Sequence, residues 1–348
     1  MFKKTLLVTS AIAAAAILST SAFAEMKLKG KMEYGYTNST RDANNVRSQG
    51  NIWSGKEIGQ ENVLSLSTSG DLDSGLGYYG KFDIEDGTQG AAEMGVTMDG
   101  ISLRFGSDTS GGTEKIKQIT PMVNNRRADV LNGTRSADAT LCYAGCDVDD
   151  VTSGANYVGI GFKHDLATFD YAYNPNLGGS NVNDTDKKTT AANKGSGTSW
   201  SIKGGFGVEG LTLAYGVSTE KTIVANQEDG DSKIYGAAYK YGQFAIGYQK
   251  SENEEGDVAA ASRKTAETTD YSITYSVNDA LSIGYLDSKT DYKSTPTTVA
   301  ITTDAKVYQV GYSLGAMSLH ATMAKADNAF ATTGEDFSVY KLKAKLAF

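Results

Sequence analysis

The chain has 348 residues, and its 33 Lys and Arg against 41 Asp and Glu give a net charge of −8. A balance this acidic argues against nucleic acid as a partner. Proline is rare (3), whereas glycine (39) and tyrosine (20) are abundant, and this composition favours short strands and turns over long helices.

The first 24 residues have the three parts of an export signal. Two lysines precede a short, mostly apolar core at residues 6–18, and a small-x-small cleavage site ends at Ala24. The thirteen residues of this core are too few to span a bilayer as a helix. We therefore expect a cleaved signal peptide at 1–24, with the mature chain starting at Glu25 and a single domain over 25–348.

After residue 25 the side chains alternate between apolar and polar, as they do in strands that have two different faces. The alternation predicts five strands, at 26–37, 61–70, 76–86, 91–98 and 101–107. Residues 108–153 then form the longest segment without alternation. Segments of that length inside a compact fold are usually functional or disordered.

The alternation then resumes and predicts eleven further strands. They lie at 155–163, 167–174, 198–206, 211–218, 233–241, 244–248, 271–277, 281–285, 308–314, 317–323 and 335–348. Every second connection is a short turn, and the others are mostly long and polar. This asymmetry predicts an all-β fold, a 16-stranded antiparallel transmembrane β-barrel with short periplasmic turns and long extracellular loops.

The last strand has an apolar face and ends on an aromatic residue. Tyr340, Leu342, Leu346 and Phe348 share that face, and lysines occupy the other. Because backbone polar groups cannot stay unpaired in hydrocarbon, we expect the first and last strands to pair antiparallel. Tyrosine and tryptophan near strand ends suit the two membrane interfaces. About sixteen strands leave an aqueous channel inside the barrel.

Four segments together resemble the general porins of Gram-negative bacteria, most closely the alphaproteobacterial type. They are the AFA-E export site, the opening strand MKLKGKMEYGY, the strand ISLRFGS before the long segment, and the terminal KLKAKLAF. The resemblance implies a homotrimer in outer-membrane lipid, inserted by the outer-membrane assembly machinery. It implies a water-filled channel for passive diffusion of ions and small hydrophilic solutes. It also implies that 108–153 is the third loop, folded inward as a constriction.

The same resemblance implies that acids on this loop face bases on the wall. The candidates are Glu114, Asp129 and Asp138 on the loop, with Lys31, Lys81, Arg104, Lys341 and Lys343 on the wall. Rings of charge commonly set the ion selectivity of a channel. The alternative, that each charge is a solvated wall residue without a special role, stays open, as does the sign of the selectivity.

The only cysteines, Cys142 and Cys146, lie on the long segment. In an oxidising compartment this pair favours a small disulfide-closed turn, because a metal site would need more Cys or His nearby. No cofactor is expected. The acidic stretches 147–150 and 252–257 offer oxygens to Ca²⁺, but they lack EF-hand spacing, which favours a solvated surface.

Three other functions are alternatives to a general channel. A substrate-specific channel, such as an eighteen-stranded sugar channel, would line its interior with aromatics, and the inward faces here show few. An enzyme needs a base beside a nucleophile, but His164 falls at a turn and His320 on an inward face, so no enzyme is expected. A secreted β-rich adhesin or binding protein would lack the heat-modifiable gel migration of a barrel.

Overall fold

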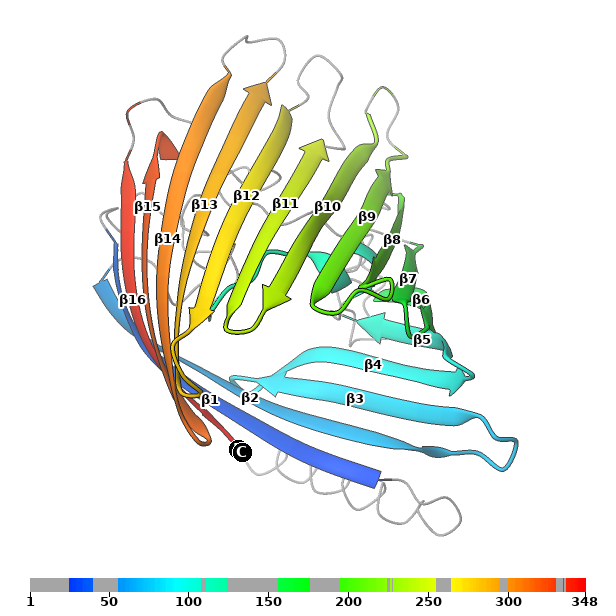
Figure 1. Ribbon diagram of the computed structural model, residues 1–348. Helices are drawn as coiled ribbons and strands as arrows, with labels where there is room; N and C mark the ends of the chain where they lie inside the picture. The colour runs from blue at the N-terminus through cyan, green and yellow to red at the C-terminus, as the bar shows by residue number, and fades with distance from the viewer. Residues whose placement is uncertain are drawn as a thin grey trace.

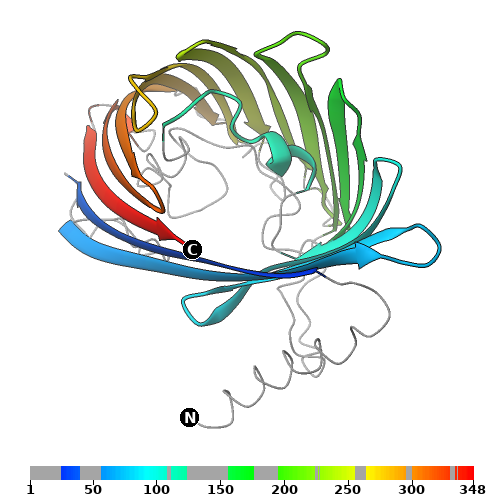
Figure 2. The ribbon, with the colours of Figure 1, turned by 60° about the horizontal axis from the view of Figure 1, so that its bottom comes forward.

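Alternation of apolar and polar side chains produces sixteen strands, which close into one antiparallel barrel (Figure 1, Figure 2). The computed structural model describes residues 25–39, 56–107, 111–123, 156–175, 195–223, 226, 228–254, 264–294, 300–329, 334 and 336–348. The predicted all-β, sixteen-stranded architecture is confirmed. No described helix is long and apolar enough to cross a membrane. The expected signal peptide at 1–24 lies outside the described residues.

Each strand pairs with its neighbours in sequence, and β1 pairs antiparallel with β16. The first half of the barrel contains β1 (Glu25–Ser39), β2 (Lys56–Asp71), β3 (Gly77–Glu85), β4 (Thr88–Met98), β5 (Ile101–Ser107), the 3-10 helix η1 (Gly112–Ile116), β6 (Asn156–Lys163), β7 (Ala167–Asn174) and β8 (Ser196–Gly204). The second half contains β9 (Leu211–Lys221), β10 (Gly230–Tyr241), β11 (Phe244–Glu254), β12 (Lys264–Ser276), β13 (Leu281–Ser294), β14 (Ile301–Leu314), β15 (Met317–Asp327) and β16 (Phe337–Ala347).

Short turns lie on one rim of the barrel, as the sequence predicted. Asp99 and Gly100 join β4 to β5 with φ angles of 48° and 82°. Two consecutive positive φ angles match the right-handed twist of a two-residue hairpin. The opposite rim carries one exception to the long loops, because Asp86 and Gly87 (φ 46° and 84°) join β3 to β4 directly.

Several strands extend further toward the long-loop rim than the apolar pattern indicated. The prediction placed strands at 271–277 and 281–285, whereas β12 is Lys264–Ser276 and β13 is Leu281–Ser294. Backbone hydrogen bonding continues beyond the apolar belt, because the ladder itself satisfies the N–H and C=O groups whatever the side chains are. The acidic stretch 252–257 was therefore only partly a loop, since Glu252 lies within β11.

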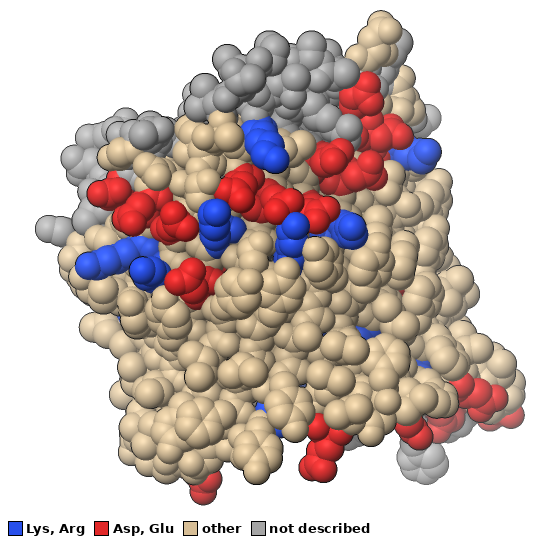
Figure 3. Space-filling view, turned by 45° about the horizontal axis from the view of Figure 1, so that its top comes forward, with Lys and Arg blue, Asp and Glu red and all other residues tan. Residues whose placement is uncertain are grey.

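The outer face of the barrel carries a broad belt with few charged side chains (tan in Figure 3), and many of its exposed residues are large and apolar. Leu28, for example, has 64% of its surface exposed. Aromatic rings pair across neighbouring strands, with centroids 4.5 Å apart for Phe244 and Tyr275 and 5.1 Å apart for Tyr285 and Tyr308. So large an exposed apolar surface is not found on soluble monomers and indicates contact with lipid or protein.

The end of the chain closes the barrel against β1. The Gly30 N–H donates to the Phe348 carbonyl at 2.7 Å, and the Phe348 N–H donates to the Gly30 carbonyl at 3.0 Å. The Phe348 ring covers Gly30 so closely that a Cβ at position 30 would overlap it. The other predicted residues of the closing strand, Tyr340, Leu342 and Leu346, are exposed on the outer face.

We predict that Gly30→Val weakens the closed barrel, because the new side chain displaces the Phe348 ring. The free energy of unfolding should fall by about 1–3 kcal/mol, as in overpacked sites. Urea unfolding of the refolded protein in detergent, followed by gel mobility without heating, measures the change. Leu28→Val is the control, since Leu28 lies on the same face of β1 and is exposed. Equal losses in the two variants would contradict the role given to the Phe348 ring.

Candidate functional site

Small polar side chains line much of the interior of the barrel. Their inward position follows from the alternation, because each outward apolar residue places its neighbours on the inner face. The buried members include Ser199, Ser201, Ser218, Ser232, Ser251, Thr268, Ser272, Thr290, Thr303 and Thr322. An interior of this kind can hydrogen-bond water and hydrated solutes.

Residues 111–123 run inside the barrel, along the inner wall from β7 to β14 (Figure 2). At the start, the Gly112 N–H donates to Asp170 Oδ1 of β7 at 2.6 Å. At the end, the Val123 N–H donates to Gln309 Oε1 of β14 at 2.9 Å. The inward fold of the third loop is therefore confirmed for this part, which we call the docked segment. The rest of 108–153 lies outside the described residues.

The middle of the docked segment is held by both polar and apolar contacts. Gln249 of β11 accepts the Ile119 N–H at 2.6 Å and donates to the Lys117 carbonyl at 3.2 Å. Such bonds satisfy backbone groups that the loop cannot pair by itself. A buried cluster anchors the same region, formed by Ile116, Ile119, Ala214 and Ile234.

Inward-facing glycines let the docked segment lie flat on the wall. A Cβ at Gly247 would overlap Pro121. A Cβ at Gly284 or Gly311 would lie 2.7 or 2.8 Å from the side chain of Val123. Contacts that short do not occur for real Cβ atoms, so any larger residue would move the segment into the channel.

A buried ion network lies where the docked segment begins. Arg104, only 5% exposed, forms an ion pair with Asp170. The Glu93 carboxylate lies 4.0 Å from Arg104 Nε and accepts hydrogen bonds from Tyr79 at 3.0 Å and Tyr157 at 2.9 Å. Because buried charges are stable only when paired, this network fixes the carboxylate that holds the loop.

Arg104 lies on the wall, as expected, but its described partners are acids of the wall and not of the loop. Arg104 lies across Gly159 of β6, where a Cβ would come within 2.6 Å of Arg104 Nε. The missing side chain lets the guanidinium pass over β6 to Asp170 on β7.

The other predicted wall bases are also mostly engaged. Lys31 forms an ion pair with Glu61 of β2, and Lys343 pairs with Glu33 across the β16–β1 junction. Lys341 is buried in β16. Lys31 and Lys343 therefore balance acids of the same wall.

The predicted loop acids are only partly within the described residues. Glu114 lies in η1 and forms an ion pair with Lys117, which lies three residues later in the same segment. Asp129 and Asp138 lie outside the described residues, as do Cys142 and Cys146. The expected face-to-face arrangement of loop acids and wall bases therefore stays a prediction.

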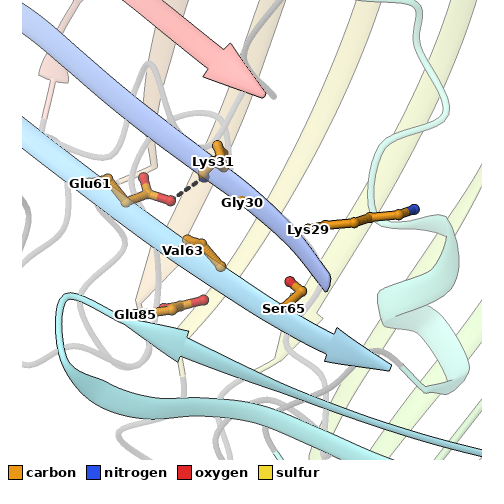
Figure 4. Close-up of a pocket in the computed structure, with 7 residues that line it drawn as sticks. All are labelled: Lys29, Gly30, Lys31, Glu61, Val63, Ser65 and Glu85. Carbon is orange, nitrogen blue, oxygen red and sulfur yellow. Dashed lines mark hydrogen bonds and ion pairs between the residues drawn. The ribbon is translucent and has the colours of Figure 1, made fainter. Parts of the chain in front are cut away.

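Lys29 and Lys81 of the inner face and Lys115 of the docked segment have exposed side chains. Although the Lys115 side chain reaches the channel, nearby protein atoms displace part of its water, and this desolvation lowers its pKa. Repulsion from Arg104 and Lys81 acts in the same direction, and attraction by Asp170 and Glu93 opposes it. Beside Lys29 the wall is hollowed into a cavity of about 240 Å³ (Figure 4). Its lining consists of Lys29, Gly30, Lys31, Glu61, Val63, Ser65 and Glu85.

The structure gives no described metal centre. Within the described ranges, no group of three His, Cys, Asp or Glu could hold a metal ion. The Ca²⁺ expectation for 147–150 falls outside those ranges. In 252–257, Glu252 contacts Lys233 and Lys250 instead. Of the two histidines, His320 contacts Ser318 at 2.8 Å on the inner face, and His164 lies at the turn after β6.

Sequence reasoning missed the side chains that anchor the loop. Asp170, Gln249 and Gln309 are single polar residues in strands and have no motif of their own. Their only sequence signal is an inward position in the alternation, which they share with many serines and threonines. Their role depends on the register that brings them beneath the docked segment.

Known proteins share this arrangement. A family model described as Gram-negative porin matches residues 9–313. No curated protein matches the chain.

A porin structure refined at 1.8 Å resolution is 15% identical, with 93% of this chain and 100% of that chain covered and a TM-score of 0.65. An anion-selective porin from Comamonas acidovorans is 14% identical, with the same coverage and a TM-score of 0.67. The trimer form of the outer membrane protein OmpT of Vibrio cholerae is 10% identical, with 93% and 99% covered and a TM-score of 0.66.

We predict that Asp170→Asn loosens the docked segment. The change removes the partner of Arg104 and the charge that holds the Gly112 N–H, and breaking a buried ion pair costs about 3–5 kcal/mol. Single-channel recording should show larger and noisier current steps. Thr268→Val is the control, because among the described residues the Thr268 hydroxyl bonds only Thr290 of the wall, at 2.9 Å. Unchanged steps in Asp170→Asn would contradict the anchoring role.

Proposed function

The chain belongs to the Gram-negative porin family, and from this membership and the interior described above we propose passive diffusion of ions and small hydrophilic solutes through a water-filled channel. The observation that carries the proposal is the docked segment. It lies against β7 to β14, where it covers wall hydroxyls such as Ser199 and Ser201, so it narrows the polar interior from one side. The channel belongs to the outer membrane, where closed barrels of this family reside.

The lining selects solutes by their size and hydration and does not recognise one particular compound. Hydroxyl groups on β8 to β15 donate and accept hydrogen bonds equally well. Lys31 with Glu61 and Lys343 with Glu33 present both signs of charge on the opposite wall. A wall of this type suits general diffusion better than the retention of one ligand, and it requires neither a cofactor nor a catalytic group.

The outer surface supports a position in the lipid. Toward the long-loop rim, Lys250 lies 2.9 Å from Glu267 and 3.5 Å from Glu252, within a charged band (Figure 3). Two residues before Lys250 in β11, the Tyr248 ring packs against the Tyr271 ring, with centroids 5.3 Å apart. Charges next to tyrosines mark a boundary between headgroups and hydrocarbon. Outer-membrane lipid is therefore the partner proposed for this surface.

A second copy is the partner proposed for the face formed by β5, β6 and β7. These strands have only 7, 8 and 8 residues, whereas β13 and β14 have 14 each. A tilted strand needs about 9–11 residues to cross the hydrocarbon. The outward residues here are apolar, among them Leu103, Phe105 and Ile160. A neighbouring copy of the protein can cover this apolar surface and also the part of the hydrocarbon layer that the short strands do not cross. This supports a homotrimer, the form recorded for the Vibrio cholerae protein.

We predict stepwise conductance when the purified protein is added to a planar bilayer. The steps should come in groups of three, and a salt gradient should report the ion preference from the reversal potential. Liposome swelling with neutral sugars of increasing size gives the exclusion limit. No conductance from protein that still migrates as a folded barrel on an unheated gel would contradict the proposal.

We predict that Leu103→Gln weakens the trimer. Burying an amide in place of this leucine forfeits about 2 kcal/mol of apolar burial per copy. Light scattering in mild detergent should show a shift toward the monomer mass. Ile283→Gln places the same amide on the outward face of β13, where Ile283 is exposed, and should leave the mass unchanged. The same mass for both variants and the parent protein would argue against this face as the interface.

A further inference from the structure

Three lysines of the barrel interior have no described acidic partner, namely Lys29, Lys81 and Lys115. None of the three forms an ion pair with any residue that the structure describes, while Lys31 and Arg104 each have an acidic partner. All three side chains are exposed to the interior of the barrel. An unpaired ammonium in a confined space attracts anions, because little protein charge cancels its field.

The register places two of these lysines on the same wall. Lys81 of β3 lies opposite Ser67 of β2, and Lys29 of β1 lies opposite Ser65, two residues along the same strand. Strands β1 and β3 are two strands apart, which is about 10 Å. Figure 4 shows the Lys29 side chain extending away from the Lys31–Glu61 ion pair. Two long side chains on this spacing can reach one ligand.

The docked segment adds the third lysine from the other side. Lys115 lies in η1, which packs on β7, β8, β9 and β10. Arg104 and Lys81 of the wall repel the Lys115 ammonium, whereas Asp170 and Glu93, which already have partners on the wall, attract it. Lys115 and Lys81 therefore face each other across the channel as charges of the same sign. Placing like charges together costs free energy in the empty channel, and an anion between them would relieve that cost.

Nearby acids do not cancel these charges. Asp170 pairs with Arg104, and Glu93 accepts hydrogen bonds from two tyrosines. Glu61 pairs with Lys31. Asp83 of β3 lies opposite Ser65 in the row of Lys29, and Glu85 lines the same cavity as Lys29, so two acids oppose the three lysines. The described charges at this level therefore leave a net positive region.

We propose that Lys29, Lys81 and Lys115 form a binding site for small multivalent anions of the phosphate or dicarboxylate class, within the channel and between η1 and the β1–β3 wall. The proposal rests on the proposed channel function and names the solutes that the channel favours. An oxyanion with two negative charges can contact ammonium groups on both sides at once. A monovalent cation would meet net repulsion there.

The test is block of chloride current by inorganic phosphate in planar bilayers. Phosphate should reduce the current of the parent protein. K29Q, K81Q and K115Q should each raise the half-blocking concentration about fivefold, the factor expected for loss of one partly exposed ion pair. The three variants should also shift the reversal potential toward cation preference. K306Q is the matched control, since Lys306 is exposed on the outer face of β14 and carries the same charge.

Two results would overturn the site. One is a phosphate block in the triple lysine variant equal to that of K306Q. The other is a conducting parent channel that phosphate does not block. A second measurement does not depend on conductance, namely broadening of the phosphate ³¹P resonance by refolded protein in detergent. If no channel is recorded but the broadening disappears in the triple variant and persists in K306Q, the proposed transport fails while the anion site stands.

Discussion

In a hydrocarbon environment every backbone N–H and C=O must find a partner within the protein, because no water is present to replace it. This constraint explains why sixteen strands close into a ring instead of leaving two edges. It also explains the pairing of Gly30 with Phe348, where the last residue of the chain exchanges two backbone hydrogen bonds with the first strand. The apolar outer face and the polar inner face then follow from the two-residue period of a strand.

Inside the barrel the backbone of the loop also needs hydrogen-bond partners, and side chains of the wall provide them. The docked segment has almost no regular structure, yet its N–H groups donate to Asp170, Gln249 and Gln309 of the wall. Wall glycines such as Gly247 provide the space, and the buried pair of Arg104 with Asp170 holds one anchor in place. Loop and wall therefore form one unit, in which the shape of the channel depends on single polar side chains from distant strands.

Much of the fold could be predicted from the sequence, because a strand with one apolar face carries a visible two-residue pattern. The pattern fails where both faces are polar, so the rim ends of β12 and β13 were missed. The site was harder to predict. Glu33 and Glu61 are plain in the sequence, but their pairing with lysines is set by register between strands. Gln309 lies 186 residues from the loop residue that it binds, a distance that no local pattern bridges. The roles of Asp129 and Asp138 stay predictions.

The junction of β1 and β16 has a consequence for the order of folding. It joins Lys31 to Ala347 and carries the Lys343–Glu33 ion pair. Forming this junction first would close a loop of more than 300 residues, at an entropic cost of about 5 kcal/mol. Pairing neighbouring strands first closes only short loops and brings the two outer strands near each other before they meet. The junction is then the last step, and until it forms the chain has two free strand edges. Those two edges complement each other, so they could pair equally well with the edges of a second unfinished chain, and unpaired strand edges are known sites of such association.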